Sequence, residues 1–485
     1  MTKSSPSKWS PWVLLVSVAV LLLMLLSSFY LWQLFSSPRL VEEARERLRA
    51  EGAPMTFREL AVGPPVPDEE NAALVLIALE SYFTRTALEE FIDTFSDWDY
   101  ENENHPGMLA PWTELSEEER QQLTQLLDSK DVRHILAEVH RALALPGMDR
   151  QVDPENYELN LGPMYFQRVV SLYLLKANQS LFLAGKADSA EAREALVKQG
   201  YSSLLEALEL TDRVTEDSSF VTFIDALSKV GFGRMTLEAV QNADRGFPLP
   251  RVLFPRFVAL LTDSEINSLW TRILDQERFF MEKAIDICSV QERVELAVSY
   301  PFDSDAPWAE YVEKAYVYWA LPSFYRYYAA WYDSLRELRK ANLMDPAWAD
   351  ESQTILCQYF DKTAEDFGSE DLDGLFSTYM KVGNHLQADW SLRQVVACGL
   401  AINAYADDRG QLPSSLEALV PDYLPEVPVD PLSPKGGTIR YEPLGDHFRL
   451  WAVGLNGIDD SGLHAENWQE GDLVFRGRRA VFDEL

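Results

Sequence analysis

One uncharged apolar segment near the N-terminus constrains this chain more than any other feature. Residues 12–35 read WVLLVSVAVLLLMLLSSFYLWQLF and contain no charged side chain. A helix of this length rises about 1.5 Å a residue to roughly 36 Å, which suffices to cross a hydrocarbon core of about 30 Å. Aromatic residues stand at both ends of the segment, as is typical of membrane interfaces. The sequence therefore predicts a transmembrane anchor over residues 12–35, preceded by a tail of residues 1–11.

A cleaved signal peptide is the alternative interpretation of such a segment. Signal peptides have a shorter apolar stretch that ends in small residues. Here the stretch ends in Phe29, Tyr30, Trp32 and Phe35, and no cysteine follows that could carry a lipid. We therefore expect an uncleaved anchor, and the membrane is the first partner that the sequence predicts.

The charges on the two sides of the anchor leave its orientation open. Two lysines precede the anchor, and four arginines follow it: Lys3, Lys8, Arg39, Arg45, Arg47 and Arg49. Counting these charges favours a cytoplasmic body. Long domains cross membranes largely regardless of charge, however, and a short N-terminal tail is the natural cytoplasmic end of a signal anchor. We expect a single-pass protein of a bacterial inner membrane whose body lies in the periplasm or otherwise outside the cytoplasm.

The rest of the chain is acidic and has the composition of a folded protein. Asp and Glu number 77 against 43 Lys and Arg, a net charge of −34, while 47% of the residues are hydrophobic. No basic cluster offsets the negative charge, so we exclude nucleic acid as a partner. The three cysteines, Cys288, Cys357 and Cys398, lie far apart and cannot form a complete disulfide framework.

The pattern of the body is mainly α, in a bundle or an irregular helical repeat. A juxtamembrane helix and a proline-rich linker are expected over residues 36–70, and a helical domain over residues 71–385. Ser116 with Glu119, and Thr262 with Glu265, have the spacing of capping boxes. Residues 172–210 predict two antiparallel helices joined at Gly185-Lys186.

Residues 386–485 have a different pattern, that of a small α+β module. A helix is expected from about Gln387 to Asp408, and Ser414 with Glu417 predicts a cap for a short helix after it. Prolines then punctuate an extended crossing. Strands are expected over residues 438–441, 447–453 and 472–476, the first two joined by a turn at Gly445-Asp446.

This module resembles the globular domain of the major pseudopilins of type II secretion systems over about residues 390–478. The resemblance rests on INAYADDRGQLPSSLEAL, YLPEVPVDPL, IRY, FRLWAVGLNGIDDSG and EGDLVF, in that order. Its motif residues are Tyr405, Asp408, Gly410, Pro413, Asp430 and Pro431. The resemblance implies the fold of the module and a loop over residues 454–472 that binds calcium. The chain departs from the family because it has no processing site and no glutamate near the start of the apolar helix.

Calcium is the one cofactor that this resemblance implies. The ion takes six to eight oxygen ligands from carboxylates, amides and backbone carbonyls. Asn456, Asp459, Asp460 and Asp472 are the predicted ligands. Asn456 stands where the family usually has an acidic residue. Ordinary turn chemistry explains the same Asn-Gly and Asp-Asp-Ser-Gly sequences, and both interpretations stay open.

No catalytic motif stands out, and no catalytic residue is predicted. The sequence contains no HExxH, GxSxG or GxxxxGK[ST]. An aromatic run over residues 311–332 could line a binding cleft, but aromatics at helical spacing are more often core. We expect a membrane-anchored, non-enzymatic interaction or scaffold protein with an unidentified protein partner. The alternatives are an extracytoplasmic hydrolase acting on a polymer, with its site near residues 311–332, and a subunit related to type II secretion.

Overall fold

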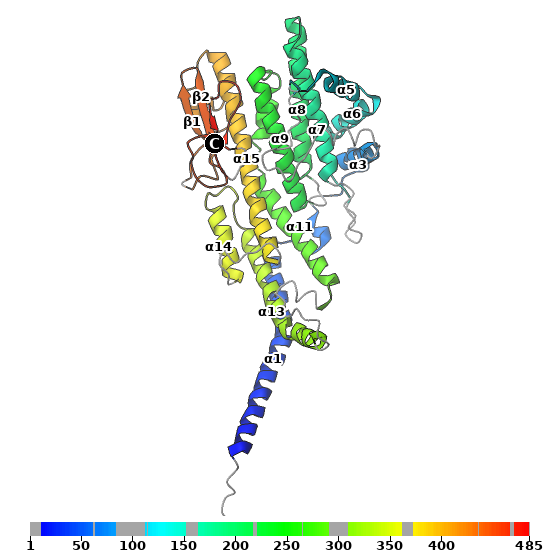
Figure 1. Cartoon of the computed structure of the whole chain (residues 1–485), viewed down its shortest axis with the longest axis vertical. Helices are drawn as coiled ribbons and strands as arrows, with labels where there is room; N and C mark the ends of the chain where they lie inside the picture. Colours follow the sequence, from blue (N-terminus) through cyan, green and yellow to red (C-terminus); the bar gives the residue numbers. More distant parts are fainter. Residues whose placement is uncertain are drawn as a thin grey trace, which may run out of the picture. The chain divides into compact units, whose positions relative to one another are not determined.

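A computed structural model describes most of the chain and divides it into two compact units. The described residues are 11–61, 64–83, 112–113, 115–151, 163–216, 221–263, 265–290, 309–360, 372–434, 436–465 and 470–484. Unit 1 comprises Met1–Ala53, Phe280–Lys340 and Gln353–Ser377, and unit 2 comprises Pro54–Phe279, Ala341–Ser352 and Thr378–Leu485. The mainly helical fold with a small C-terminal sheet that the sequence predicts is confirmed (Figure 1).

Unit 1 begins with one long helix, α1 (Pro11–Ala50), which joins the predicted anchor and the predicted juxtamembrane helix. Pro38 lies inside it and removes one backbone hydrogen bond. The hydroxyl of Ser37 donates to the carbonyl of Gln33 one turn earlier, which supplies a polar partner beside this gap. A proline in the sequence therefore does not separate two helices here.

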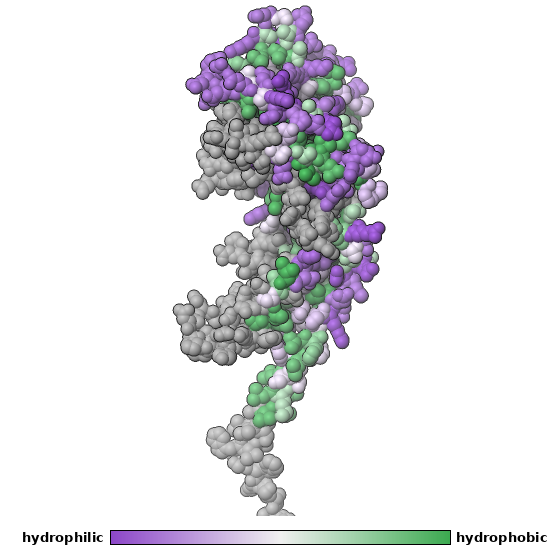
Figure 2. Space-filling model, turned by 90° about the vertical axis from the view of Figure 1, so that its right-hand side faces the viewer, coloured by the Kyte–Doolittle hydropathy of each residue, from purple (hydrophilic) through white to green (hydrophobic). Residues whose placement is uncertain are grey.

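The anchor part of α1 exposes its apolar side chains. Leu23, Leu26 and Trp32 are each 64% exposed, and apolar residues dominate the narrow stretch of α1 in Figure 2. Within the described residues, α1 is the one helix long and apolar enough to cross a membrane. Such a continuous apolar surface is unfavourable in water, and a hydrocarbon environment removes that cost.

The rest of unit 1 packs against the second part of α1. Helix α13 (Ala309–Leu338) lies along α1 and contributes Val317, Ala320 and Phe324 to a buried cluster with Ile285. Trp331 and Tyr332 of the aromatic run are 3% and 2% exposed. The described aromatic side chains therefore include core residues, as their helical spacing indicates. Helix α14 (Trp348–Phe360) contributes to both units.

Unit 2 holds most of the helices. They are α2 (Phe57–Leu60), the 3-10 helix η1 (Asp68–Glu70), α3 (Ala72–Phe83), α5 (Glu117–Leu127), α6 (Lys130–Leu143), α7 (Pro163–Gly185), α8 (Ala190–Arg213), α9 (Phe223–Gly246), α10 (Phe254–Leu261) and most of α11 (Ile266–Ile287). The predicted hairpin is confirmed as the α7–α8 pair, which lie side by side (Figure 1).

One predicted capping box is confirmed and the other is wrong. Ser116 and Glu119 form both reciprocal hydrogen bonds at the start of α5. Thr262 instead ends α10, and its hydroxyl donates to the carbonyl of Val258. A Thr three residues before a Glu also occurs by chance where one helix ends and the next begins. The motif alone therefore does not show whether the hydroxyl caps the start of the second helix or hydrogen-bonds within the end of the first.

The C-terminal sheet matches the predicted strands in order. β1 (Arg440–Leu444) and β2 (His447–Ala452) form an antiparallel hairpin around Gly445-Asp446, and β4 (Leu473–Val474) pairs antiparallel with β2. A second, parallel pair joins β3 (Leu463–His464) to β5 (Asp483–Glu484). The predicted short helix is the 3-10 helix η3 (Leu416–Leu419), and Ser415, rather than Ser414, occupies its N-cap.

Helix α15 (Leu372–Arg409) is the centre of unit 2. It runs without a break past residue 385, and every residue from Leu386 to Ala404 is buried. A helix buried on all faces needs neighbours on every side. In Figure 1 α15 lies between the β1–β2 hairpin and α9, and the Asn403 side chain donates hydrogen bonds to Asp244 of α9 and to the carbonyl of Arg478 in the C-terminal segment.

Gly399 lets the C-terminal sheet approach α15 closely. A Cβ at this position would lie 2.4 Å from three atoms of the Phe475 ring, and that ring is fully buried and stacks on Phe448. A Cβ at Gly246, the last residue of α9, would have no neighbouring atom within 4 Å. The two glycines therefore differ in packing and share a helical backbone.

We predict that Gly399→Ala lowers the free energy of unfolding by about 1–3 kcal/mol, because the ring of Phe475 cannot move without disturbing the sheet. Gly246→Ala is the matched control and should change stability by less than about 1 kcal/mol. Thermal and urea unfolding of the two variants measures the difference. Equal stability of the two would show that Phe475 does not pack on Gly399.

Candidate functional site

A buried network of charged side chains joins three helices of unit 2. Arg393 on α15 lies 3.0 Å from Asp212 at the end of α8 and 2.9 Å from Asp389, one turn earlier on α15. Lys229 on α9 lies 2.8 Å from the same Asp212. The side chains of Arg393 and Asp389 are 6% and 4% exposed. Two acids and two bases therefore balance inside the helical body.

The two carboxylates of this network differ in environment. Burial raises the pKa of Asp389, and Arg393 offsets this only in part. Burial acts on Asp212 as well, but Arg393 and Lys229 together outweigh it, so the pKa of Asp212 is lowered. A charge this deep persists only when paired, since an unpaired buried ion costs several kcal/mol, on the order of the whole stability of a domain.

A cavity opens beside this network. Its volume is about 260 Å³, and Asp212, Lys229, Asp389 and Arg393 form part of its wall. The rest of the wall comes from the segment after α8, from α10, α11 and α15, and from the loop before α11: Thr215, Glu216, Leu260, Asp263, Glu265, Ile266, Ser268, Leu269, Arg272, Leu386 and Trp390. Acidic and basic side chains therefore converge on one cavity within unit 2.

Arg478, in the segment that follows β4, joins the end of the chain to α9 and α15. Arg478 makes two hydrogen bonds to Asp407, at 3.0 and 2.6 Å, and its backbone N–H donates to Asp244 at 2.8 Å. Asn403 donates to both Asp244 and the carbonyl of Arg478. Burial raises the pKa of Asp244 to about 6. The module is therefore an integral part of unit 2.

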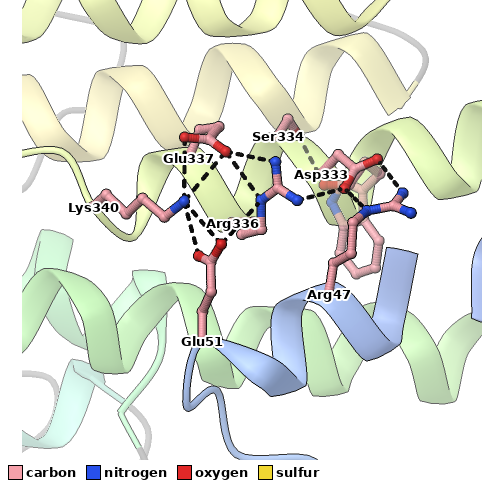
Figure 3. Close-up of polar contacts among 8 residues, drawn as sticks. Arg47, Glu51, Asp333, Ser334, Arg336, Glu337 and Lys340 are labelled. Atoms are coloured by element: carbon pink, nitrogen blue, oxygen red, sulfur yellow. Dashed lines mark hydrogen bonds and ion pairs between the residues drawn. The ribbon is translucent and has the colours of Figure 1, made fainter. Parts of the chain in front are cut away.

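A second group of charges in unit 1 joins α1 to α13 (Figure 3). Arg47 makes a two-pronged contact with Asp333, at 3.0 and 2.7 Å. Glu51 lies between Lys340 and Arg336, at 2.9 and 3.6 Å. Each pair is partly exposed and contributes on the order of 0.2–1 kcal/mol, but together they fix the register of two adjacent helices.

The predicted calcium ligands lie in one loop with different partners. Asp459 lies 3.0 Å from Arg440 and accepts a hydrogen bond from the indole of Trp451. Asn456 donates to Asp460 at 3.0 Å. Among the described residues, no group of three or more His, Cys, Asp or Glu side chains is arranged to hold a metal. A calcium ion would therefore have to displace Arg440 to reach Asp459.

Asp472 is the predicted ligand with a free acceptor. It is 2% exposed, one carboxylate oxygen accepts from the N–H of Gly462, and the other, Oδ1, has no hydrogen-bond partner. Burial, together with the nearby carboxylates Asp459 and Asp460, raises the pKa of Asp472 to about 6. A buried oxygen without a donor suits a cation, so this residue fits the predicted ion.

The residues that carry the pseudopilin resemblance contact one another. Asp430 is buried, accepts from the N–H of Val453 and pairs with Arg440. The Tyr423 hydroxyl donates to Asp408 at 2.8 Å. Gly410 ends α15 with φ of +70°, a conformation that favours glycine. These residues therefore have structural roles within the module.

Comparison with protein-family models, with curated proteins and with solved structures finds no match to this chain. The resemblance to pseudopilins thus rests on the sequence pattern of the module.

Sequence reasoning missed the buried charge network. Asp212, Lys229 and Arg393 come from three helices that only the fold brings together. One signal was present, because Asp389 and Arg393 stand one turn apart on the same helix. Charged pairs at this spacing are also common on exposed faces, and burial decides between the two.

We predict that Arg393→Met lowers the free energy of unfolding by about 3–5 kcal/mol, because it leaves two buried carboxylates with one cation. Arg256→Met is the control. Arg256 also pairs with a carboxylate of α8, Glu209, but is 61% exposed, so its loss should cost no more than about 1 kcal/mol. Urea unfolding at neutral pH compares them. Losses of the same size would show that the Arg393 network is not a buried one.

Proposed function

We propose that this protein is a membrane-anchored, non-enzymatic interaction protein whose pseudopilin-like C-terminal module caps a helical body. The observation that carries the proposal is the burial of α15. Every residue from Leu386 to Ala404 is covered within unit 2, so this helix has no face left for pairing with helices of other subunits. This burial favours a module that is built into the body, and it argues against a subunit that assembles into a filament.

The anchor is supported by α1. Its apolar part is exposed over residues that include Leu21, Leu23 and Leu26, and the helix continues without interruption into the part that packs on α13. Ion pairs of Arg47 and Glu51 hold that continuation. A rigid connection of this kind suits a protein that presents a surface at a fixed place relative to the bilayer. We propose a body outside the cytoplasm of a bacterial inner membrane.

The state of the buried carboxylates supports a non-enzymatic role. General acid–base catalysis needs carboxyl groups free to exchange protons with a substrate. Asp212 and Asp389 are instead both bound to Arg393, and the cavity beside them is too small for a polymer strand. The hydrolase alternative places its substrate-binding cleft at the aromatic run of residues 311–332. The described part of this run packs in the core.

Calcium binding by the C-terminal loop is a second proposal. It is favoured by the buried Oδ1 of Asp472, which has no hydrogen-bond partner, and by the proximity of Asp459 and Asp460. Asp472, Asp460 and the carbonyl oxygen of Asn456 would hold the ion, with Asp459 after release from Arg440. The ion would neutralise these charges and order the loop.

We predict that the full chain stays in the membrane fraction after alkaline carbonate extraction and that removal of residues 1–35 makes it soluble. The truncation leaves the part of α1 that packs on α13, so unit 1 keeps its ion pairs. Circular dichroism should show that the truncated chain is still helical. Extraction of the full chain into the soluble fraction would contradict the anchor.

We predict that calcium raises the melting temperature of the chain of residues 36–485 relative to chelator. The gain is about 2.7 kcal/mol at a hundredfold excess over the dissociation constant. The shift should be smaller at pH 5.5 than at pH 7.5, because protonation of Asp472, whose pKa is about 6, competes with the ion. Differential scanning calorimetry measures both.

The double variant Asp460→Asn/Asp472→Asn should abolish the increase in melting temperature that calcium causes. Asp422→Asn/Glu426→Gln removes the same charge from exposed positions of the same module and should keep it. A shift that survives in the first variant would place calcium elsewhere on the acidic surface. The absence of any shift in the unmodified chain would remove calcium and leave the loop as ordinary turn structure.

A further inference from the structure

The cavity beside the charge network has one apolar wall. Leu260, Ile266, Leu269, Leu386 and Trp390 line it, from α10, α11 and α15. Trp390 is 8% exposed and Leu386 is 2% exposed, so each turns only a small part of its surface to the cavity and is held in place by the surrounding helices. A wall of this kind contacts hydrocarbon and excludes it from water, which is the usual source of affinity in a small-molecule pocket.

The charges that line the cavity are predominantly negative. Five carboxylates stand against three bases: Asp212, Glu216, Asp263, Glu265 and Asp389 against Lys229, Arg272 and Arg393. Asp212 and Asp389 are neutralised by Lys229 and Arg393 within the network. The remaining lining therefore carries three acids and one base.

The excess negative charge lies at exposed positions. Glu216, Asp263 and Glu265 are exposed, and Glu216 pairs with Arg213 at 2.7 Å. Asp263 and Glu265 have no ion pair among the described residues of the chain. Both precede α11, where acidic residues also stabilise the start of a helix. The arrangement thus combines a polar acidic side with an apolar wall.

We propose that this cavity binds a small aliphatic amine, with the ammonium group at Asp263 and Glu265 and the methylene chain against Leu269, Leu386 and Trp390. Anions are repelled by the lining, and a neutral diol can donate hydrogen bonds to the carboxylates but forms no ion pair with them. A volume of about 260 Å³ admits a molecule of a few carbon atoms and excludes a polymer. An indole face also attracts an organic cation.

This site is independent of the anchor and of the calcium loop. Its residues come from α8 to α11 and α15, and none belongs to residues 12–35 or 454–472. A failure to bind amine would therefore leave the proposed scaffold function standing. Binding of amine would add a ligand-sensing role to the body.

The test is isothermal titration calorimetry of the full chain in detergent micelles at pH 7.5. The probe is 1,5-diaminopentane, and 1,5-pentanediol and glutarate are the neutral and anionic probes of the same length. We expect the diamine to bind at least tenfold more tightly than the diol and glutarate not to bind. Equal heats for diamine and diol, or no diamine binding at millimolar concentration, would overturn the proposal.

Two variants localise the binding. Asp263→Asn/Glu265→Gln should weaken diamine binding at least fivefold, and Ser268→Trp, at an exposed position of the lining, should block the cavity. Glu191→Gln/Glu194→Gln removes the same charge from exposed positions outside the cavity and should leave the affinity unchanged. Melting temperatures check that each variant folds. Equal weakening in the control would reduce the effect to net charge and overturn the site.

Discussion

The burial of α15 organises unit 2, and the cation of Arg393 makes that burial possible. An apolar helix can be covered on every face at a favourable free energy, but α15 carries Asp389 and Arg393 inside its covered stretch. Each would be costly alone. Paired with each other and with Asp212 of α8, they become a fixed point to which α8 and α9 must be aligned.

The same helix explains why the C-terminal module is not an independent appendage. Its sheet packs Phe475 on Gly399, and the backbone of Arg478 binds Asp244 of α9. A fragment that begins at residue 386 would therefore lose the ion pair and hydrogen bonds that α8, α9 and α10 make with α15. Calcium experiments belong on the longer chain for this reason. In unit 1 the apolar part of α1 is likewise continuous with the part of the same helix that packs on α13 and is joined to it by ion pairs.

Much of the fold could be predicted from local patterns. Length and the absence of charge identified residues 12–35, periodicity identified the α7–α8 hairpin, and Gly445-Asp446 identified the β1–β2 turn. Errors arose where one local signal has two meanings. Thr262 was expected to begin a helix and ends one, and the anchor and the juxtamembrane helix, expected as separate elements, form one continuous helix through Pro38.

The sequence by itself determined the fold class, mainly helical with one long apolar segment near the N-terminus. The length of that segment, the helical periodicity and the net charge are properties of the chain before it folds. The sequence also determined the order of the C-terminal strands, since turns are local. Only the tertiary structure decided which charges are buried together, because Asp212, Lys229 and Arg393 lie on separate helices and no local pattern links them. It likewise decided that Asp459 is held by Arg440 while Asp472 keeps an unpaired oxygen. Partners of charged groups depend on three-dimensional proximity, and composition does not encode it.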